Sequence, residues 1–335
     1  MPHPHKSIVI EDRSSIGEAR RAAAYAAYTL GFDEGRRNDI AIVATEAATN
    51  VLMHAQSGEF LICPFLEGGT IWLDLFALDS GPGIRDIPRA MEDGYSTMGT
   101  AGQGLGAIGR LSDQSSLYSI AGKGTVYWSR FCAGETTPSM SLGLVNIPVH
   151  GEKTCGDSYL ALLGATHSLY MVVDGLGHGV GATEAAEEAV SAVSRFRDKP
   201  PSEIIALSHE CLKKTRGAAI SVAIVDHERQ TLTCAGVGNI GGMIVNSSGY
   251  RSMASQNGTL GAVIPRTIQT YCYPIDGNST LIMFSDGLST KSGTSTYPGI
   301  QTRHPAVAAG LLYRDFGRKR DDATVLVAPI GGNRL

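Results

Sequence analysis

The sequence lacks the features that mark a membrane protein, a disulfide-rich protein or a nucleic-acid-binding protein. It has no apolar run of the roughly 20 residues that a membrane-spanning helix needs, and its N-terminal stretch has no apolar core of a secretion signal. Its six cysteines are scattered without a Cys-x-x-Cys pair, which argues against zinc and disulfides and for reduced thiols in the cytoplasm. It has 28 basic against 32 acidic residues, so it lacks the basic surface that nucleic-acid binding requires. We therefore expect a cytoplasmic protein that contacts neither membrane nor nucleic acid.

The chain does have enough apolar residues for two packed domains. Its 335 residues are long for one domain, and 43% of them are hydrophobic. The stretch FCAGETTPSMSLG at 131–143 separates two apolar segments with small, polar and proline residues, which indicates a boundary. We expect a first domain over 1–132, a linker over 133–142 and a second domain over 143–335.

The first half predicts two helices followed by antiparallel strands. Helical spacing covers 14–31 and 33–55, and the second helix begins after Asp33. The apolar residues on one face of that helix are Ile40, Val43, Ala47 and Val51. Two strands over 59–68 and 69–79 and a hairpin over 115–131 follow, with a glycine-rich stretch at 94–109 leading into a short helix. This order favours a two-layer α/β sandwich.

The second half predicts two helices surrounded by strands. The helices cover 179–197 and 201–215, and Ser202 is expected to cap the second. The strand-like runs are 141–150, 159–164, 167–174, 218–226, 230–238, 241–246, 279–286 and 322–330. So many strands around two long helices favour stacked sheets flanked by helices.

Acidic residues stand where strands of the second half end or begin. They are Asp157, Asp174, Asp286 and the pair Asp321 and Asp322. One Asp-Gly after a strand is an ordinary turn, but four such sites in one domain need a common explanation. Carboxylates without basic partners repel each other, and a divalent cation removes that repulsion. Ligation by oxygen alone favours magnesium or manganese over zinc.

A phosphate-binding loop is the alternative for one of these acids. The run GHGVGA at 177–182 follows a strand and fits a loose dinucleotide-binding pattern. That pattern also needs an acid at the end of the next strand, whereas helical sequence follows here. The acid set is therefore the stronger signal, and Asp174 is expected to bind metal.

Four motifs carry a resemblance to a known family. CGD, VDGLGHG, SDGL and RDDATVLV, in this order, are similar to the metal-dependent serine/threonine phosphatases of the SpoIIE/RsbX branch, over about 140–330. The resemblance implies a PPM-type αββα sandwich with two Mn²⁺ or Mg²⁺ ions and hydrolysis by a water held between them. The implied ligands are Asp157, Asp174, the Gly175 carbonyl, Asp286 and Asp321, with Asp322 as the less favoured member of its pair. Asp157, Asp174 and Asp286 would also be catalytic. The glycines after Asp174 would give the turn that brings a backbone carbonyl to the metals.

The first half contains four polar or glycine-rich segments. EAATN places Glu46 and Asn50 one helical turn apart, which alone is typical of an exposed polar stripe. DSGPG at 79–83, GQGLGAIG at 102–109 and GKGT at 122–125 add glycines near strand or helix ends. The second of these contains G-x-G-x-x-G but does not directly follow a strand, so a Rossmann interpretation fails.

Together these segments resemble the N box and the three glycine boxes of the GHKL (Bergerat) ATPase fold. MEDGYST ahead of GQGLG narrows the resemblance to RsbT-like and SpoIIAB-like anti-sigma-factor serine kinases, over about 8–131. The resemblance implies a site for ATP or ADP with Mg²⁺, in which Glu46 is the general base and Asn50 holds the magnesium. The implied nucleotide-binding residues are Asp79, Gly81, Gly83 and Thr125 around the adenine, and Gly102, Gly104, Leu105 and Gly106 in the lid. Amides at the start of the lid helix would face the phosphates.

The two resemblances imply opposed chemistries. Such kinases phosphorylate a serine or threonine of a small STAS-domain protein, and such phosphatases remove that phosphate. Our hypothesis is a bifunctional enzyme that sets the phosphorylation state of a STAS-domain anti-sigma-factor antagonist, with a sigma factor or a stressosome as further partner. One alternative is a phosphatase regulated by a catalytically silent nucleotide domain, and another is a module that only sequesters a sigma factor or STAS protein. Manganese and magnesium suit the ligands equally, and the oligomeric state stays open.

Overall fold

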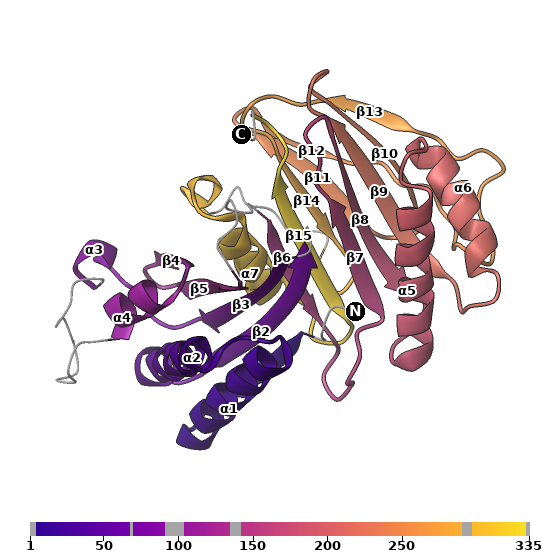
Figure 1. The fold of residues 1–335 in the computed structure, drawn as a ribbon. Helices are drawn as coiled ribbons and strands as arrows, with labels where there is room; N and C mark the ends of the chain where they lie inside the picture. The colour runs from indigo at the N-terminus through magenta and orange to yellow at the C-terminus, as the bar shows by residue number, and fades with distance from the viewer. Residues whose placement is uncertain (1–4, 68–69, 91–103, 135–141, 290–296, 333–335) are drawn as a thin grey trace. The chain divides into compact units, whose positions relative to one another are not determined.

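The computed structural model describes residues 5–67, 70–90, 104–134, 142–289 and 297–332 (Figure 1). The chain divides into two compact units, one of Met1–Met140 with Thr294–Arg314 and the other of Ser141–Gly293 with Asp315–Leu335. A segment from late in the sequence, 297–314 in the described part, thus belongs to the first unit. The sequence suggested a single cut at 133–142 and did not anticipate this return. No helix of the described residues is long and apolar enough to cross a membrane.

The first unit is built on one antiparallel sheet in the order β1-β2-β3-β5-β4 (Figure 1). Its strands are β1 (Lys6–Ile10), β2 (Gly58–Glu67), β3 (Thr70–Asp79), β4 (Gln114–Ile120) and β5 (Gly124–Ala133). The two hairpins were expected, whereas β1 was not. Its five residues are flanked by charged and polar sequence, and it is defined by pairing with β2 about 50 residues later.

Helices cover one face of this sheet. They are α1 (Arg13–Thr29), α2 (Glu34–Ala55) and α4 (Gly104–Leu111), and a short α3 (Ile87–Ala90) lies before the lid sequence. The Asp33 side chain caps α2 by accepting a hydrogen bond from the Arg36 N–H at 2.9 Å. The face predicted to be apolar, Ile40, Val43, Ala47 and Val51, is buried in the core. The helical period of the sequence therefore placed α2 correctly.

The opposite face of the same sheet is covered by the returning segment, which contains all but the last two residues of α7 (Pro305–Phe316). The His304 ring stacks on Trp128 of β5 at 4.0 Å between ring centroids. The Tyr313 hydroxyl donates to Glu59 of β2 at 2.6 Å. A Cβ on Gly310 would lie 2.9 Å from the Phe76 ring, so glycine allows the helix to approach the sheet closely. Helix α7 was not predicted from the sequence.

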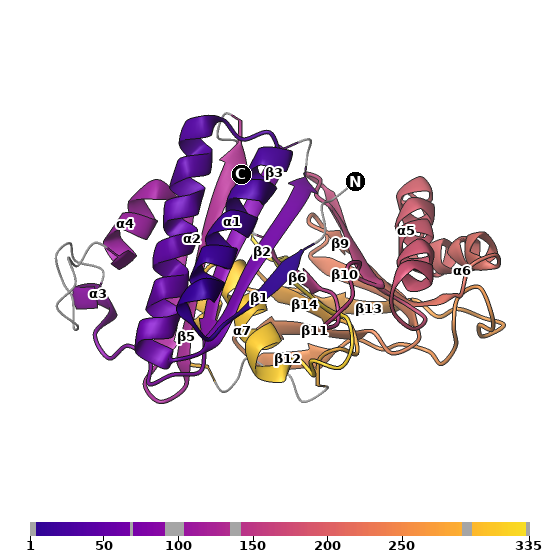
Figure 2. The same ribbon diagram turned by 90° about the horizontal axis from the view of Figure 1, so that it is seen from below.

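The second unit contains two stacked five-stranded antiparallel sheets, β13-β10-β9-β8-β7 and β12-β11-β14-β15-β6 (Figure 2). The strands of the first sheet are β7 (Asp157–Leu162), β8 (His167–Gly175), β9 (Ala218–Asp226), β10 (Thr231–Val237) and β13 (Tyr271–Pro274). Those of the second are β6 (Gly143–Ile147), β11 (Gly241–Asn246), β12 (Gly249–Ser252), β14 (Thr280–Phe284) and β15 (Ala323–Pro329). Helices α5 (Val180–Arg195) and α6 (Pro201–Leu212) lie side by side and pack on the first sheet (Figures 1 and 2).

Three details of the second unit differ from expectation. Pro200 is the N-cap of α6 and Pro201 its first residue, so the predicted cap Ser202 is wrong and lies inside the helix. The short strands β12 and β13 were not predicted, because four residues are too few to show an alternating pattern. The helices and the other strands agree with the sequence to within a few residues.

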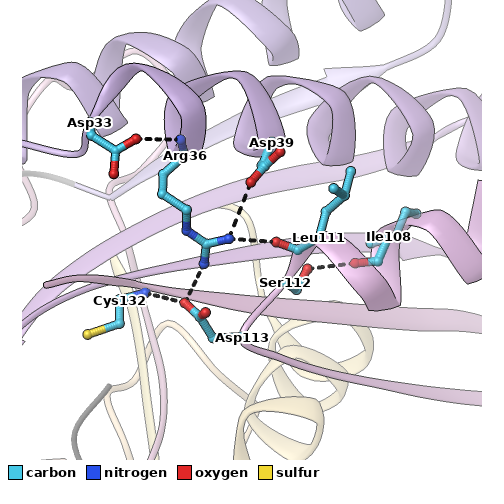
Figure 3. Close-up of polar contacts among 8 residues, drawn as sticks. All are labelled: Asp33, Arg36, Asp39, Ile108, Leu111, Ser112, Asp113 and Cys132. Carbon is cyan, nitrogen blue, oxygen red and sulfur yellow. Dashed lines mark hydrogen bonds and ion pairs between the residues drawn. The ribbon is translucent and has the colours of Figure 1, made fainter. Parts of the chain in front are cut away.

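Arg36 fixes the lid helix α4 beside α2 (Figure 3). Its guanidinium donates to the Leu111 carbonyl at 2.9 Å and to the Asp113 carboxylate at 2.6 Å. The Cys132 N–H donates to the same Asp113 carboxylate at 2.8 Å. Residue Asp39 lies 3.4 Å from the guanidinium (Figure 3). These contacts hold the end of α4 to β5, and so position the glycines at its beginning.

A buried ion pair joins the central strands of the first unit. Asp74 of β3 and Arg130 of β5 are paired in register, both side chains are 0% exposed, and two N–H groups of Arg130 donate to the two carboxylate oxygens at 2.7 and 2.8 Å. The guanidinium lies over the rings of Phe65, Trp72 and Trp128 at 5.0–5.6 Å. Both charges are thus compensated as long as both residues are present.

Removing one member of this pair should strongly destabilise the first unit. Asp74→Ala is expected to lower the free energy of unfolding by about 3–5 kcal/mol, because Arg130 is left buried without its counter-charge. Urea denaturation measures the loss. The control is the double variant Asp74→Leu with Arg130→Met, which removes both charges and should lose much less. A single variant as stable as the double variant would contradict the prediction.

Candidate active sites

Glu46 and Asn50 lie on consecutive turns of α2, and both are half-buried. The neighbouring Ala47 and Val51 face the hydrophobic core, so the two polar side chains occupy the rim of the helix. The buried amide nitrogen of Asn50 has no hydrogen-bond partner among the described residues. Buried polar atoms are almost always hydrogen-bonded, so this amide fits a side chain that a ligand completes.

Asp79 ends β3 directly opposite Thr125 of β5. Its carboxylate accepts a hydrogen bond from the Gly81 N–H at 2.8 Å, and its main-chain carbonyl accepts one from Arg314 at 2.7 Å. Burial raises the pKa of Asp79, while the Gly81 N–H and Arg314 act in the opposite direction. The carboxyl group is therefore fixed at the end of the strand, where it can recognise an amino group that donates hydrogen bonds.

Close backbone approach explains the glycines around Asp79. Gly83 has a φ of 70°, and a Cβ there would lie 2.3 Å from the Ile120 carbonyl oxygen. A Cβ on Gly81 would lie 2.6 Å from the Cβ of Ala55 at the end of α2. No other residue type fits at these positions without a shift of the loop.

One residue near Thr125, Ser119, was missed by the sequence reasoning. The Ser119 hydroxyl lies 2.9 Å from the Thr125 hydroxyl and accepts from the Ile84 N–H at 2.8 Å, so it ties the loop after Asp79 to β4 and β5. Gly124 has a φ of 84°, and a Cβ there would lie 2.0 Å from the Asp79 carbonyl oxygen. Ser119 could be found only by knowing that β4 pairs with β5.

The lid residues are described in part. Gly104, Leu105 and Gly106 form the first turn of α4, Leu105 packs against the core, and α4 contacts α2. Gly102 lies outside the described residues. The structure therefore packs the lid helix against the helix that carries Glu46. A cavity of about 820 Å³ elsewhere in this unit is lined by Phe32, Asp113 and their neighbours and includes none of the predicted nucleotide residues.

In the second unit, Asp157 and Asp174 face each other as paired residues of β7 and β8. Asp157 is 4% exposed, and its buried Oδ2 has no hydrogen-bond partner among the described residues. Burial and then the charge of Asp174 raise the pKa of Asp157. Burial and then the charge of Asp286 raise the pKa of Asp174 to about 7, with Asp321 adding to the effect. The negative charges of these acids, which come from different strands, thus raise each other's pKa.

Asp286 follows β14, and its carboxylate accepts a hydrogen bond from the Asn239 amide at 2.7 Å. Burial and the charge of Asp321 raise the pKa of Asp286, whereas Arg318 lowers it. Asn239 stands at the turn between β10 and β11, and nothing in the sequence motifs pointed to it.

The two members of the Asp321 and Asp322 pair have different surroundings. Asp322 is 2% exposed, and its two carboxylate oxygens accept the main-chain N–H groups of Val149 at 2.7 Å and Gly156 at 2.6 Å. Asp321 is exposed and accepts the Asp322 N–H at 2.9 Å. Because Asp322 is engaged by the backbone, the geometry favours Asp321 as the ligand of the pair.

A polar network behind the acids was also missed. The Asn146 amide donates to the Thr324 hydroxyl at 2.7 Å and to the Asp157 carbonyl at 3.2 Å, and the Thr324 N–H donates to the Ser285 hydroxyl at 2.9 Å. The hydroxyl groups of Ser285 and Thr324 partly offset the rise in the pKa of Asp157. They connect β6, β14 and β15 to the strand that carries this acid.

The donors fit hard divalent cations. The acids repel each other, one buried carboxylate oxygen has no partner, and Gly175 approaches Ala182 so closely that a Cβ would lie 2.2 Å from its carbonyl oxygen. No group of three or more acid, histidine or cysteine side chains in the described ranges is assembled tightly enough to enclose an ion. Magnesium commonly uses one or two carboxylates and keeps several waters, so the acids suit it without such a cage.

Comparison with known proteins assigns both halves of the chain to families. The model for Stage II sporulation protein E (SpoIIE) matches residues 165–330, and the model for the histidine kinase-like ATPase domain matches residues 11–130. The first half is 40% identical over 110 residues to the serine/threonine-protein kinase RsbT of Bacillus subtilis (strain 168). This match covers 33% of this chain and 83% of RsbT. The second is 25% identical over 139 residues to the phosphoserine phosphatase RsbX of the same organism, which spans 42% of this chain and 70% of RsbX.

A solved structure is also similar to part of the chain. It comes from "The bacterial stressosome: a modular system that has been adapted to control secondary messenger signaling", with 27% identity and a TM-score of 0.54, over 56% of this chain and 97% of the other. The expected order of folds, an ATPase-type α/β sandwich and then a phosphatase-type sandwich, is confirmed.

The acid cluster predicts that removing the charge of Asp174 stabilises the metal-free protein and reduces the stability gained when metal binds. A carboxyl group whose pKa rises from 3.8 to about 7 on folding binds its proton more tightly in the folded state, so stability falls as the pH rises between these values. Above pH 7 in chelator, Asp174→Asn should therefore raise the free energy of unfolding by roughly 2 kcal/mol, or about 4–8 °C in the midpoint. With Mn²⁺, wild type should gain stability by binding, and the variant should gain less.

Differential scanning calorimetry of both proteins measures these two effects. Asp198→Asn, a change at an exposed acid outside the cluster, is the control and should behave as wild type in both buffers. A variant that is less stable than wild type in chelator at pH 8 would contradict the idea that repulsion dominates at Asp174.

Proposed function

Because the chain belongs to the RsbT-like serine/threonine kinases through its ATPase-type first half and to the SpoIIE-type phosphatases through its second, we propose that it sets the phosphorylation of one partner from both sides. The chain is a kinase and phosphatase of partner-switching regulation. The proposed substrate is a serine or threonine of a STAS-domain protein, either an anti-sigma-factor antagonist or a stressosome component. The similarity to RsbT, to RsbX and to a stressosome structure supports this substrate class.

One observation carries the proposal: the two sets of predicted residues fall in different compact units. Glu46, Asn50 and Asp79 lie in the first unit, and Asp157 with Asp174 lies in the second. Each set has its own buried polar atom that finds no hydrogen-bond partner in the described part of the chain, the Asn50 amide nitrogen and the Asp157 Oδ2. Two incomplete polar sites in separate units support two separate chemistries.

In the first unit, the protein positions ATP and the substrate hydroxyl. Asp79 would accept a hydrogen bond from the adenine amino group, and Asn50 would hold a magnesium ion that neutralises charge on the phosphates. Glu46, one turn before Asn50, takes the proton of the serine or threonine hydroxyl as its oxygen attacks the γ-phosphorus and ADP leaves. Phosphoryl transfer depends mainly on such positioning and on neutralised charge.

In the second unit, the acids hold two Mn²⁺ or Mg²⁺ ions, which when bound supply an activated water and neutralise the phosphoryl oxygens. The proposed ligands are Asp157, Asp174, the Gly175 carbonyl, Asp286 and Asp321. Asn239 orients Asp286 through its amide, and the backbone N–H groups on Asp322 hold β15 beside the other acids. No side-chain nucleophile takes part.

The opposed activities predict a trapped phosphoprotein. With ATP and a STAS-domain substrate, Asp174→Ala should accumulate phosphorylated substrate, because hydrolysis is lost while the kinase continues. Wild type should hold less, and the double variant with Glu46→Ala should form none above about 1% of the single variant, since general-base catalysis contributes about 10²–10⁴-fold. Phosphate-affinity gels or mass spectrometry measure the product.

Three results separate this proposal from its rivals. In the first, wild type removes phosphate from the substrate with Mn²⁺, but Asp174→Ala never phosphorylates the substrate. The protein would then be a phosphatase with a silent nucleotide domain. Substrate binding without either reaction leaves a sequestering module. Phosphorylation that persists in the Glu46→Ala protein would show that another residue is the base.

A second candidate function, nucleotide control of the phosphatase, is favoured by the returning segment. Arg314, the last residue of that segment, donates to the main-chain carbonyl of Asp79. Two residues later in α7, the Phe316 carbonyl accepts the Ser289 N–H at 2.9 Å, and the Arg318 N–H donates to the Gly287 carbonyl at 2.8 Å. Residues 314–318 thus form hydrogen bonds to the end of β3, beside the proposed adenine site, and to the loop around the metal ligand Asp286.

Arg314→Ala should weaken this control. We expect the phosphatase rate of wild type to differ about fivefold or more between saturating ATP and no nucleotide, in the usual range of coupling between sites. The variant should reduce that ratio toward one. Arg303→Ala, an exposed arginine of the same segment, is the control. Release of phosphate from a phosphopeptide gives the rates, and an unchanged ratio in Arg314→Ala would exclude this route.

A further inference from the structure

Two positive groups act on the acids of the second unit in the described part of the chain. Burial raises the pKa values of Asp322 and Asp286, whereas the charge of His178 lowers the first and that of Arg318 lowers the second. His178 is already engaged, because its Nδ1 lies 2.7 Å from the Glu152 carboxylate. Arg318 is therefore the positive charge near the acids whose own partner has to be identified.

The main chain fixes Arg318 beside the loop that carries Asp286. The Arg318 N–H donates to the carbonyl of Gly287, the residue directly after Asp286, at 2.8 Å. Next to this bond, an antiparallel bridge joins Leu288 to Gly317, so the two segments run side by side. This register holds the main chain of Arg318 against the metal-ligand loop, and from there its charge reaches the Asp286 carboxylate.

The side chain of Arg318 is near Asp286 without being paired to it. Arg318 is exposed, and its guanidinium makes no hydrogen bond and no ion pair with the described residues. The Asp286 carboxylate instead accepts a hydrogen bond from the neutral Asn239 amide at 2.7 Å. An arginine that served only to neutralise this acid would be expected to pair with it. The N–H donors of Arg318 are therefore available to a ligand at the acid cluster.

An acidic site that takes a phosphorylated substrate has an electrostatic problem. The acids of the cluster repel a phosphate dianion as they repel each other, and bound cations offset only part of this charge. A guanidinium presents parallel N–H donors that match two phosphoryl oxygens, and it stays charged at every relevant pH. An unpaired arginine whose charge already reaches Asp286 supplies what the acids lack.

We propose that Arg318 binds the phosphoryl group of the substrate in the phosphatase reaction. The inference rests on the proposed phosphatase function and adds a substrate-binding residue outside the four family motifs. Two N–H groups of Arg318 donate to two non-bridging oxygens of the phosphoserine or phosphothreonine. A water oxygen forms the new bond to phosphorus as the bond from phosphorus to the side-chain oxygen breaks. That oxygen leaves as the alcohol with one proton of the water, and inorganic phosphate remains on Arg318 until release.

The test uses the full chain without nucleotide, with Mn²⁺, p-nitrophenyl phosphate as substrate and inorganic phosphate as product inhibitor. Arg318→Ala should lower kcat/KM and raise the inhibition constant of phosphate, each by about tenfold to hundredfold, because a charge-assisted bidentate contact is lost. Arg318→Lys should recover part of both, since it keeps the charge but not the fork. Arg251→Ala, which removes an exposed arginine of β12 in the same unit, is the matched control and should match wild type.

The affinity for Mn²⁺ separates binding of phosphate from support of the metal site. Arg318→Ala removes a positive charge that acts on Asp286, so it should leave Mn²⁺ affinity unchanged or raise it, because like charges repel. The midpoint of thermal unfolding should stay near that of wild type, since the side chain is exposed and the main-chain bond to Gly287 is kept. Weaker Mn²⁺ binding and a lower midpoint, with inhibition by phosphate unchanged, would show a structural role and overturn the inference.

Binding of phosphate without turnover is the remaining readout. Isothermal titration of inorganic phosphate into the Mg²⁺-loaded protein should show weaker binding to Arg318→Ala than to wild type or to Arg251→Ala. Equal phosphate affinity in wild type and Arg318→Ala would overturn the inference while leaving the phosphatase intact. A wild type that hydrolyses neither p-nitrophenyl phosphate nor a phosphoserine peptide would instead overturn the proposed phosphatase function.

Discussion

Mutual repulsion of carboxylates is the constraint on which the second unit depends. Asp157 and Asp174 face each other across two paired strands, and burial together with neighbouring negative charge raises the pKa of both. Most of the groups that hold the acids in place are neutral: the Asn239 amide, two main-chain N–H groups on Asp322 and the hydroxyl groups behind Asp157. Neutral donors fix the positions of acids without cancelling their charge, so the site keeps its affinity for cations. Basic partners would instead have cancelled the negative charge that attracts the cations.

The first unit handles buried charge in the opposite way. Asp74 and Arg130 compensate each other fully in the middle of the sheet, where no ligand is expected. At the end of the same strand, the Asp79 carboxylate has main-chain N–H groups and the charges of Arg314 and His54 to offset its burial. The sheet therefore separates a structural acid from an acid that can still accept a hydrogen bond from a ligand. The four residues between them make this difference possible, because they put one acid in the core and the other at the strand end.

Local signals predicted most of the fold, and contacts between distant segments account for the failures. Asp33 as a helix cap, the buried face of α2 and the strands around Asp174 follow from periodicity and turn residues within a few positions. The acid motifs likewise came together because each stands at the end of a strand that alternation predicts. Ser119 and Asn239 had no such signal, since their roles arise from residues 6 and 47 positions away. Helix α7 was missed, and the residues that it packs against lie more than 170 positions earlier in the chain.

The return of 297–314 to the first unit bears on how one chain can carry opposed reactions. A kinase and a phosphatase that act on the same group without control would only consume ATP. Control requires an element that both sites can bias. The stretch from Arg314 to Arg318 bonds the carbonyl of Asp79 at one end and that of Gly287, next to Asp286, at the other. Arg318 in turn lies only three residues before Asp321. The proposed nucleotide control would use this segment, since its residues are hydrogen-bonded in each unit.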